Sequence, residues 1–240
     1  MKENSLLQKP FSLSVVFPAF NEEKNISATI KEATGVAESL TQDFEIIIVD
    51  DGSTDSTRVV LAEEATKNPK LRTITHQTNQ GYGAAVWSGI TASTKEYVFF
   101  SDSDLQFKLD ELAGFIQHLL EYDAVLGYRA KRQDPFMRLL DAKAWNLLNR
   151  LLFGLKIKDI DCAFKLFKAG FVKDLPIRSR GAMFSAELLI LLKNRGAKIK
   201  ELPVTHLPRK AGSPTGAKLT VIFRALREMF KVYRRNLRVS

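Results

Sequence analysis

Two aspartates, Asp102 and Asp104, stand two residues apart directly after the apolar run 97–100. Side chains at positions i and i+2 of an extended chain point to the same side, so both carboxylates can face one ligand. Such a pair of oxygen ligands suits Mg²⁺ or Mn²⁺ and leaves coordination positions for phosphate oxygens. Gln106 offers a third oxygen. We therefore predict a divalent metal site here, and a cap of the following helix by Ser103 or Asp104 is the alternative.

A second acidic pair, Asp50 and Asp51, ends the most hydrophobic run of the chain, 46–49. An acid at this position can accept hydrogen bonds from a nucleotide base or from ribose hydroxyls. The alternative is a polar turn through Gly52 with Asp55 as a helix cap. That alternative does not explain two adjacent acids, which repel each other unless a cation or a hydrogen-bond donor meets them. We therefore favour a nucleotide-binding role for the pair.

The glycines of the segment 79–83 (NQGYG) precede a helical pattern, as in phosphate-binding loops. The segment lacks a third glycine, and the chain contains no Gly-Lys-Ser/Thr motif, so neither a P-loop nor a dinucleotide site is indicated. We interpret the segment as a helix start that needs a close backbone approach. His76, His118 and His206 are scattered along the chain and are interpreted as structural residues.

These side chains stand at the ends of strands in an alternating β/α pattern. The predicted strands are 13–18, 45–50, 71–76, 97–101 and 124–128, and the predicted helices are 22–40, 56–67, 82–93 and 109–121. Short buried strands that alternate with helices are typical of a parallel sheet, which binds ligands beyond the carboxyl ends of its strands. Four of these ends carry polar side chains, namely Asn21 with Glu22, Asp50 with Asp51, Asp102 with Asp104, and Arg129. The sequence therefore predicts a binding site at that edge.

The second half of the chain is less regular. We predict a helix with a wide apolar face at 136–153, a strand at 161–168, a helix at 183–195, a strand at 198–204, a loop at 208–216 and a final helix at 217–238. The predicted organisation is an N-terminal extension (1–11), an α/β domain (12–207) and a basic loop with an amphipathic helix (208–240).

The composition is that of a globular protein, with 45% apolar and 26% charged residues among 240. The lone Cys162 excludes an internal disulfide framework and a cysteine-rich zinc site. We find no apolar stretch of signal-peptide length near the start and no run of about 20 apolar residues that would span a membrane. We therefore expect a cytoplasmic protein that is not integral to a membrane.

The net charge of +9 is concentrated near the C-terminus, where residues 209–238 carry nine Lys or Arg and only one acid, Glu228. In a helical projection, the apolar side chains of 219–237 occupy an arc of about 120° and the basic ones the neighbouring arc. A basic amphipathic helix with aromatic residues suits the surface of an anionic membrane. The alternative is that the apolar arc packs on the domain or on another subunit. Nucleic acid is not favoured, because the aromatic residues lie outside the basic arc.

Five motifs in order, VVFPAFNEEKN, IIIVDDGSTDST, NQGYGAA, FFSDSDLQ and GYR, resemble the family-2 glycosyltransferases with the GT-A fold. Within that family, the chain resembles the polyprenyl-phosphate glycosyltransferases, which include dolichol-phosphate mannosyltransferase and its bacterial glucosyl relatives. The resemblance runs from about residue 12 to about residue 170. It implies a mostly parallel α/β sheet with helices on both faces, followed here by the amphipathic helix.

The resemblance also implies roles for individual residues. The nucleotide sugar would be bound by Pro18, Ala19, Phe20, Glu22, Asp50, Asp51 and Asp102, with Arg209, Lys210 and Ser213 closing over the diphosphate. Mg²⁺ or Mn²⁺ would be held by Asp102, Asp104 and Gln106. Arg129 and Arg138 would meet the acceptor phosphate, and Asp159 matches a family acid. The family pattern is altered at Ala142 (usually serine), at Phe107 (usually proline) and at Cys162-Ala163 (usually Ser-Gly). The 208–218 loop contains GSPTGAK instead of the family's shorter Gly-x-Ser-Lys, so Lys218 is a candidate for the family's lysine.

We expect an inverting transfer of a hexose from a nucleotide sugar of the GDP-mannose or UDP-glucose type to a polyprenyl phosphate, in the synthesis of cell-envelope glycans. Inversion is implied by the resemblance alone. A lipid phosphate is largely ionised at neutral pH and needs positioning by arginine more than it needs a base. A hydroxyl acceptor is the alternative and would require a carboxylate base, for which Asp159 or Asp161 is available. A non-catalytic nucleotide-sugar-binding scaffold is the other alternative, which the substituted Ala142 leaves open.

Overall fold

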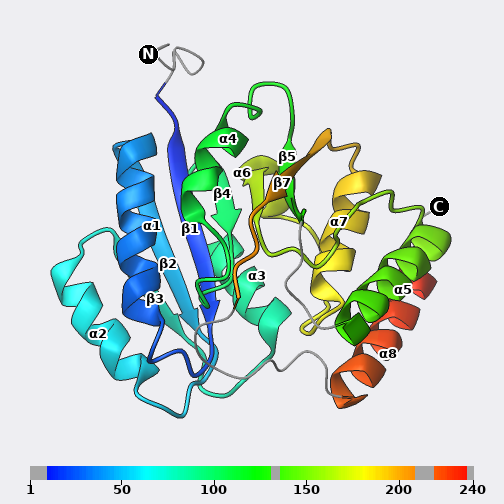
Figure 1. Ribbon diagram of the computed structural model, residues 1–240, viewed down its shortest axis with the longest axis horizontal. Helices are drawn as coiled ribbons and strands as arrows, with labels where there is room; N and C mark the ends of the chain where they lie inside the picture. The colour runs from blue at the N-terminus through cyan, green and yellow to red at the C-terminus, as the bar shows by residue number, and fades with distance from the viewer. Residues whose placement is uncertain (1–9, 131–135, 209–218, 237–240) are drawn as a thin grey trace.

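The computed structural model describes residues 10–130, 136–208 and 219–236, with side chains described for these ranges except 136–141, 219–224 and 236. Seven strands form one mixed sheet in the order β3-β2-β1-β4-β6-β5-β7 (Figure 1). Their bounds are β1 Ser12–Ala19, β2 Asp43–Asp50, β3 Leu71–Thr75, β4 Tyr97–Phe100, β5 Ala124–Arg129, β6 Lys165–Lys168 and β7 Ile199–Val204. The fold class is thus α/β with a mostly parallel sheet, as predicted.

Among the seven strands of the described residues, only β6 runs antiparallel to its neighbours. It pairs antiparallel with both β4 and β5, whereas the other adjacent strands pair parallel. Six strands therefore end at one edge of the sheet, and the reversed β6 begins there, with Lys165 paired to Phe100. The strand predicted at 161–168 was too long, because residues 161–164 form a turn and an irregular segment before β6. Through this reversal, the segment that precedes β6 joins the edge where the other strands end.

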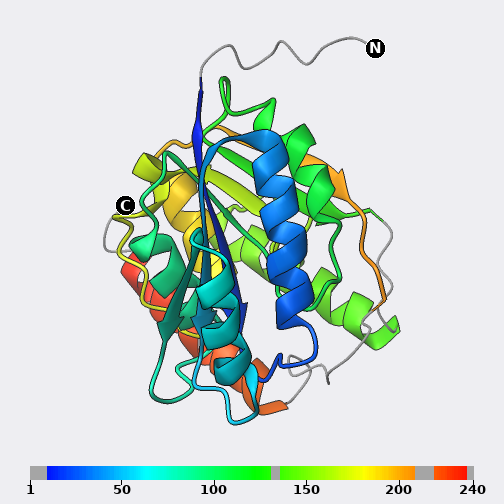
Figure 2. The ribbon, with the colours of Figure 1, turned by 90° about the vertical axis from the view of Figure 1, so that its left-hand side faces the viewer.

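The helices cover both faces of the sheet. Figure 2 shows α1 (Ile26–Leu40) on one side and α3 (Tyr82–Ala92) with α7 (Phe184–Asn194) on the other. Glycines permit the close approach of α3, since a Cβ at Gly89 would lie 2.3 Å from Cγ1 of Val16 and one at Gly83 would lie 2.4 Å from Cβ of Phe184. The remaining helices near the sheet are α2 (Thr57–Lys67), η1 (Leu109–Glu111), α4 (Leu112–Ile116) and α6 (Ala169–Val172). The helix predicted at 109–121 was wrong in extent, because it consists of a 3₁₀ turn, a short α-helix and further turns.

Aliphatic and aromatic side chains fill the space between these layers. Residues 46–49 of β2 are completely buried, as expected of a central strand covered on both faces. Phe99, Phe107 and Phe115 each contact the ring of Phe164, so aromatic side chains tie β4 and α4 to the segment before β6. This core supports the edge at which the strands end.

Two long helices lie side by side at one end of the molecule, α5 (Phe136–Phe153) and α8 (Leu219–Asn236) (Figure 1). The rings of Phe153 and Tyr233 join them, with centroids 6.0 Å apart. Met229 and Val232 belong to the hydrophobic core, so part of the predicted apolar arc of α8 packs on the domain. The domain boundary at residue 207 stays a prediction. In the part of the chain that the structure describes, no helix combines the length and the apolar character that crossing a bilayer requires.

Candidate functional site

The two acids Asp102 and Asp104 follow β4, next to the point where the strand order turns from β1 to β4. In open α/β sheets, ligands bind at such a switch point. The hydroxyl of Ser103 donates to the carbonyl of Pro18 (2.8 Å), which ties the acidic loop to the end of β1. Asp104 is 4% exposed, whereas Asp102 is half-buried. The structure therefore places the predicted pair at the edge where the sequence predicted a site.

The electrostatics of this pair favour a cation. Burial and the neighbouring charge of Asp104 raise the pKa of Asp102 to about 7, against the opposing effects of Tyr82, Arg129 and Lys165. A raised carboxyl pKa means that two negative charges are held in a site that solvates them poorly. A divalent ion would relieve this repulsion, so the donor set fits Mg²⁺ or Mn²⁺.

The third predicted ligand, Gln106, is bonded within the protein. Its side-chain nitrogen donates to the carbonyl of Leu207 (3.0 Å), and its backbone N–H donates to Oδ1 of Asp104 (3.2 Å). Within 10–130, 136–208 and 219–236, no three His, Cys, Asp or Glu residues form a group that could hold a metal. A cation here would thus take Asp102 and Asp104 and complete its coordination with amide, water or substrate oxygens, as Mg²⁺ commonly does.

The carboxylates of Asp50 and Asp51 are both satisfied by groups of the protein. Asp50 accepts from the backbone N–H of Ser53 (2.9 Å) and pairs with Nε of Arg58 (3.3 Å). Two adjacent acids need a cation or hydrogen-bond donors beside them, and the chain itself supplies both here. Both acids are almost fully buried, so they also support the loop around them.

Asp51 fixes the loop that leads into α3. It accepts from the backbone N–H groups of Gln80 and Gly81 (2.9 Å each) and lies 2.7 Å from Nδ1 of His76. Gly81 has φ +105°, and a Cβ there would lie 2.5 Å from the carbonyl oxygen of Arg180. The close backbone approach predicted for the glycine segment is confirmed. His76 has the structural place that we expected, held between Asp51 and the hydroxyl of Ser88 (3.0 Å).

The other residues predicted at the nucleotide pocket surround the end of β1. Pro18 and Ala19 are buried in the strand, whereas Phe20 is 40% exposed beyond it. The side chain of Glu22 accepts from Asn25 (2.7 Å), and its backbone N–H donates to Thr57 (2.8 Å). Arg209, Lys210 and Ser213 lie outside the described residues, as does the side chain of Arg138 at the start of α5.

Arg129 ends β5 and forms a buried ion pair with Asp159. Its Nε lies 2.7 Å from Oδ2 and its Nη2 lies 2.8 Å from Oδ1. Although burial opposes it, the bond to Asp159 raises the pKa of Arg129 above its already high ordinary value. Arg129 is therefore a permanent, oriented cation whose charge reaches Asp102.

Sequence reasoning missed two residues of this site. Tyr82, the first residue of α3, is 37% exposed and lies near Asp102. Desolvation of its hydroxyl and the charge of Asp102 raise the pKa of that hydroxyl well above the ordinary value. Lys165 is completely buried, donates to the carbonyl of Cys162 and lies 5.4 Å from the centroid of the Phe100 ring. Burial lowers the pKa of Lys165. A lysine inside the apolar run 163–167 was the available signal, since lysine is almost never fully buried without a specific role.

In a comparison with protein families, residues 14–175 match the model of glycosyl transferase family 2. The chain is similar to the undecaprenyl-phosphate 4-deoxy-4-formamido-L-arabinose transferase of Pectobacterium carotovorum subsp. carotovorum (strain PC1), with 29% identity over 84% of this chain and 62% of the relative. It is also similar to the dodecaprenyl-phosphate galacturonate synthase of Rhizobium johnstonii, with 29% identity over 83% of this chain and 60% of the relative. The chain spans about three fifths of the length of these relatives.

Among solved structures, the fold is similar to glucosyl-3-phosphoglycerate synthase from Mycobacterium tuberculosis in complex with Mn²⁺, uridine diphosphate and phosphoglyceric acid. The TM-score is 0.71, with 19% identity over 93% of this chain and 78% of the other. A second structure of that enzyme, with Mg²⁺ and uridine diphosphate, gives a TM-score of 0.71 with 18% identity over 92% of this chain and 79% of the other. At these identities, the likeness establishes the GT-A type of fold and nothing further.

Proposed function

The chain belongs to glycosyl transferase family 2, and on that premise we propose that it transfers a hexose from a nucleotide sugar to a polyprenyl phosphate at a membrane surface. The observation that carries this proposal is the edge at which Asp102, Asp104 and the Arg129–Asp159 pair come together. The curated relatives support the acceptor, because their names specify sugar transfer to undecaprenyl or dodecaprenyl phosphate.

The donor would lie across the ends of β1, β2 and β4, with its diphosphate beside Asp102 and Asp104. A bound Mg²⁺ or Mn²⁺ would supply positive charge that stabilises the diphosphate leaving group. Pro18, Ala19, Phe20 and Glu22 would line the nucleotide pocket, with Asp50 and Asp51 beneath them. Arg209, Lys210 and Ser213 would close over the diphosphate.

In the reaction, an oxygen of the lipid phosphate would form a bond to the anomeric carbon while the bond from that carbon to the diphosphate oxygen breaks. The nucleoside diphosphate leaves with the bonding electrons, and the sugar carbon is inverted. Arg129 and Arg138 would position the acceptor phosphate, because arginine binds phosphate oxygens with geometric specificity. The proposed acceptor is already ionised near neutral pH and requires no base.

The state of Asp159 favours a phosphate over a hydroxyl acceptor. A hydroxyl must lose its proton to a base, and a base must be able to reach that proton. Both oxygens of Asp159 accept hydrogen bonds from Arg129. Asp159 is thus better suited to orient Arg129 than to remove a proton from a substrate.

The proposed membrane contact is the outer surface of α5 and α8. Large apolar side chains are exposed there, namely Leu147, Leu148, Leu151, Leu152, Leu226 and Phe230. The basic residues Arg227, Lys231 and Arg234 of α8 are exposed as well. Apolar side chains beside basic ones suit the interface of an anionic bilayer, where each basic residue contributes about 1 kcal/mol.

The test is a transfer assay with purified protein, Mn²⁺ or Mg²⁺, a polyprenyl phosphate and a panel of nucleotide sugars. The lipid phase is analysed by mass spectrometry. We expect one donor to give a metal-dependent glycolipid, and we expect Asp104→Asn to abolish it while the exposed neighbour substitution Asp110→Asn does not. Binding of donors without any lipid product would reject the proposal and favour a hydroxyl acceptor or a scaffold.

A further inference from the structure

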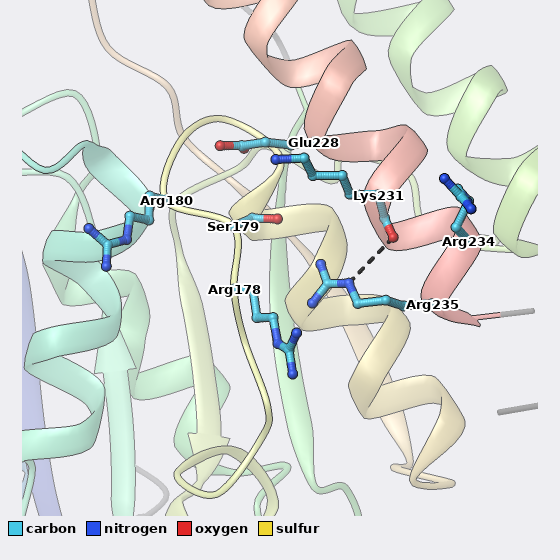
Figure 3. A pocket seen from close by; sticks show the side chains of 7 residues that line it. All are labelled: Arg178, Ser179, Arg180, Glu228, Lys231, Arg234 and Arg235. Atoms are coloured by element: carbon cyan, nitrogen blue, oxygen red, sulfur yellow. Dashed lines mark hydrogen bonds between the residues drawn. The ribbon is translucent and has the colours of Figure 1, made fainter. Parts of the chain in front are cut away.

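A basic cavity of about 550 Å³ lies between α8 and the loop that precedes α7. Its lining comes from two segments, Arg178, Ser179 and Arg180 on the loop and Glu228, Lys231, Arg234 and Arg235 on α8 (Figure 3). The residues of the strand-end site described above, Asp102, Asp104, Arg129 and Asp159, do not line this cavity. The cavity therefore needs an explanation of its own.

The charge around this cavity is unbalanced, with five cationic side chains against the carboxylate of Glu228. Arg235 is paired, since its Nη2 lies 2.8 Å from Oε1 of the buried Glu187. Arg234 lies over the ring of Phe230, 5.8 Å from the centroid. Among the described residues, no acid forms an ion pair with Arg178, Arg180 or Lys231. An excess of positive charge around one hollow creates a local potential that attracts anions.

Ser179 provides an independent sign of a ligand. The residue is 5% exposed, and its hydroxyl oxygen is buried without a hydrogen-bond partner among the described residues. Figure 3 shows this side chain directed from the loop toward α8. The loop is held in place by Glu187, whose Oε2 accepts from the backbone N–H groups of Arg178 (3.1 Å) and Ser179 (2.6 Å). Buried hydroxyls are nearly always bonded, and an unbonded one costs free energy that an acceptor oxygen in the cavity would recover.

We propose that this cavity binds a phosphate group, either a monoester or a diester. Arginine offers a planar fork of N–H donors that matches phosphate oxygens, and lysine adds a compact charge. In this site, Arg178 and Lys231 contribute charge from the two sides of the cavity and Ser179 contributes the buried donor. Phosphate can come from the headgroup of an anionic phospholipid, since α8 also carries the proposed membrane contact, or from a soluble phosphate compound. The phosphate site itself does not depend on the proposed transfer reaction.

The first test is a titration of the full chain with inorganic phosphate, followed by isothermal calorimetry, with sodium chloride at equal ionic strength as reference. Three variants are compared with the wild type, namely the double variant Arg178→Gln/Lys231→Gln, Ser179→Ala and Glu228→Gln. Arg227→Gln is the control for charge, because it removes one positive charge from an exposed position of α8 that does not line the cavity.

We expect saturable binding that weakens by at least about tenfold in the double variant and in Ser179→Ala. Glu228→Gln should tighten binding, because it removes the one acid of the lining. Arg227→Gln should bind as the wild type does. The proposal is overturned if phosphate does not bind saturably, or if Arg227→Gln weakens binding as much as the double variant, which would indicate general attraction to a basic helix.

A second arm distinguishes the two sources of phosphate. Sedimentation with vesicles of phosphatidylcholine alone is compared with vesicles that also contain phosphatidylglycerol. Loss of the phosphatidylglycerol-dependent part of vesicle binding in Ser179→Ala, which leaves the charge of the proposed membrane contact unchanged, identifies a lipid headgroup as the source. Vesicle binding by Ser179→Ala that equals that of the wild type, together with saturable phosphate binding by the wild type, identifies a soluble phosphate compound.

Discussion

Arg129 and Asp159 are joined by two parallel hydrogen bonds, Nε to Oδ2 at 2.7 Å and Nη2 to Oδ1 at 2.8 Å, with side chains only 11% and 8% exposed. Arg129 ends β5, and Asp159 precedes the one reversed strand, β6. The reversal of β6 is therefore what places this acid beside this arginine. The pair gives the site an oriented cation whose charge acts on Asp102, one of the two proposed metal ligands.

The first prediction concerns the stability of this pair. Asp159→Ala leaves a buried guanidinium without its counter-ion, which typically costs about 3–5 kcal/mol. We expect a loss of this size in the free energy of unfolding, measured by urea denaturation. Asp43→Ala is the control, because it breaks the more exposed pair with Lys95 and should cost much less. Equal losses in the two variants would contradict the structural role given to the Arg129–Asp159 pair.

The second prediction concerns pH and metal. The pKa of Asp102 is about 7 in the folded protein, above its ordinary value of 3.8. The proton bound by Asp102 stabilises the folded state. This stabilisation is fully present below pH 3.8, and it is lost as the pH rises through about 7. In the absence of divalent ions, the Tm of the wild type should thus fall between pH 6 and pH 8 relative to the Tm of the Asp102→Asn variant.

Mn²⁺ should raise the Tm of the wild type more at pH 8 than at pH 6, because at pH 8 the metal ion no longer competes with a proton for Asp102. Thermal unfolding with EDTA and with Mn²⁺ measures both effects, and an equal Mn²⁺ shift at the two pH values would count against the site.

The third prediction concerns Gly52, which has φ +73°. Alanine there would bring a Cβ within 2.6 Å of the carbonyl carbon of Thr78. Thr78 belongs to the loop whose backbone N–H groups, at Gln80 and Gly81, donate to Asp51. We expect Gly52→Ala to cost at least about 1–2 kcal/mol of stability and to weaken binding of the nucleotide sugar, measured by calorimetry. Gly35→Ala is the matched control, since a Cβ there meets open space in the middle of α1 and should stabilise the helix by about 0.5–1 kcal/mol. Unchanged stability and binding in Gly52→Ala would show that this loop tolerates displacement.

The fourth prediction concerns the surface of α5 and α8. The double variant Leu151→Ser/Phe230→Ser removes side chains that are 74% and 61% exposed. The double variant should bind anionic vesicles at least about tenfold more weakly, because the protein then buries less apolar side-chain area in the membrane. Leu120→Ser is the control, as Leu120 is 67% exposed elsewhere on the molecule. If both variants bind vesicles like the wild type in a sedimentation assay, this surface is not the membrane contact.

The sequence predicted the regular half of the fold because periodicity and strand-end chemistry are local signals. The helix 136–153 was predicted with its observed bounds, and the strands before residue 130 lie within one or two residues of those observed. The direction of β6 is set by long-range packing of Phe164 and Phe167 against β4, which no local pattern carries. The extent predicted for the helix at 109–121 was wrong for a related reason, since turns that precede β5 replace its second half.

At the site, sequence reasoning identified the strand-end acids but not their partners. The positions of Asp102 and Asp104 follow from the strand that precedes them, whereas the contact of Tyr82 with Asp102 depends on how α3 packs across the sheet. The doubled acids Asp50 and Asp51 were expected to meet donors, and those donors come from Arg58, His76 and the loop before α3. The apolar arc of α8 also had two competing interpretations. Met229 packs in the core while Phe230 is exposed, so the packing interpretation holds for one part of the arc.

The measurement that tests the central claim most directly compares two acceptors that differ only in the phosphate. Purified protein with Mn²⁺ and its active nucleotide sugar is given either a polyprenyl phosphate or the corresponding polyprenol, and the products are followed by mass spectrometry. We predict sugar transfer to the phosphate, no transfer to the alcohol, and loss of transfer in Asp104→Asn. Transfer to the alcohol at a similar rate would contradict the account, because it would show that a carboxylate other than Asp159, such as Asp161, acts as a catalytic base.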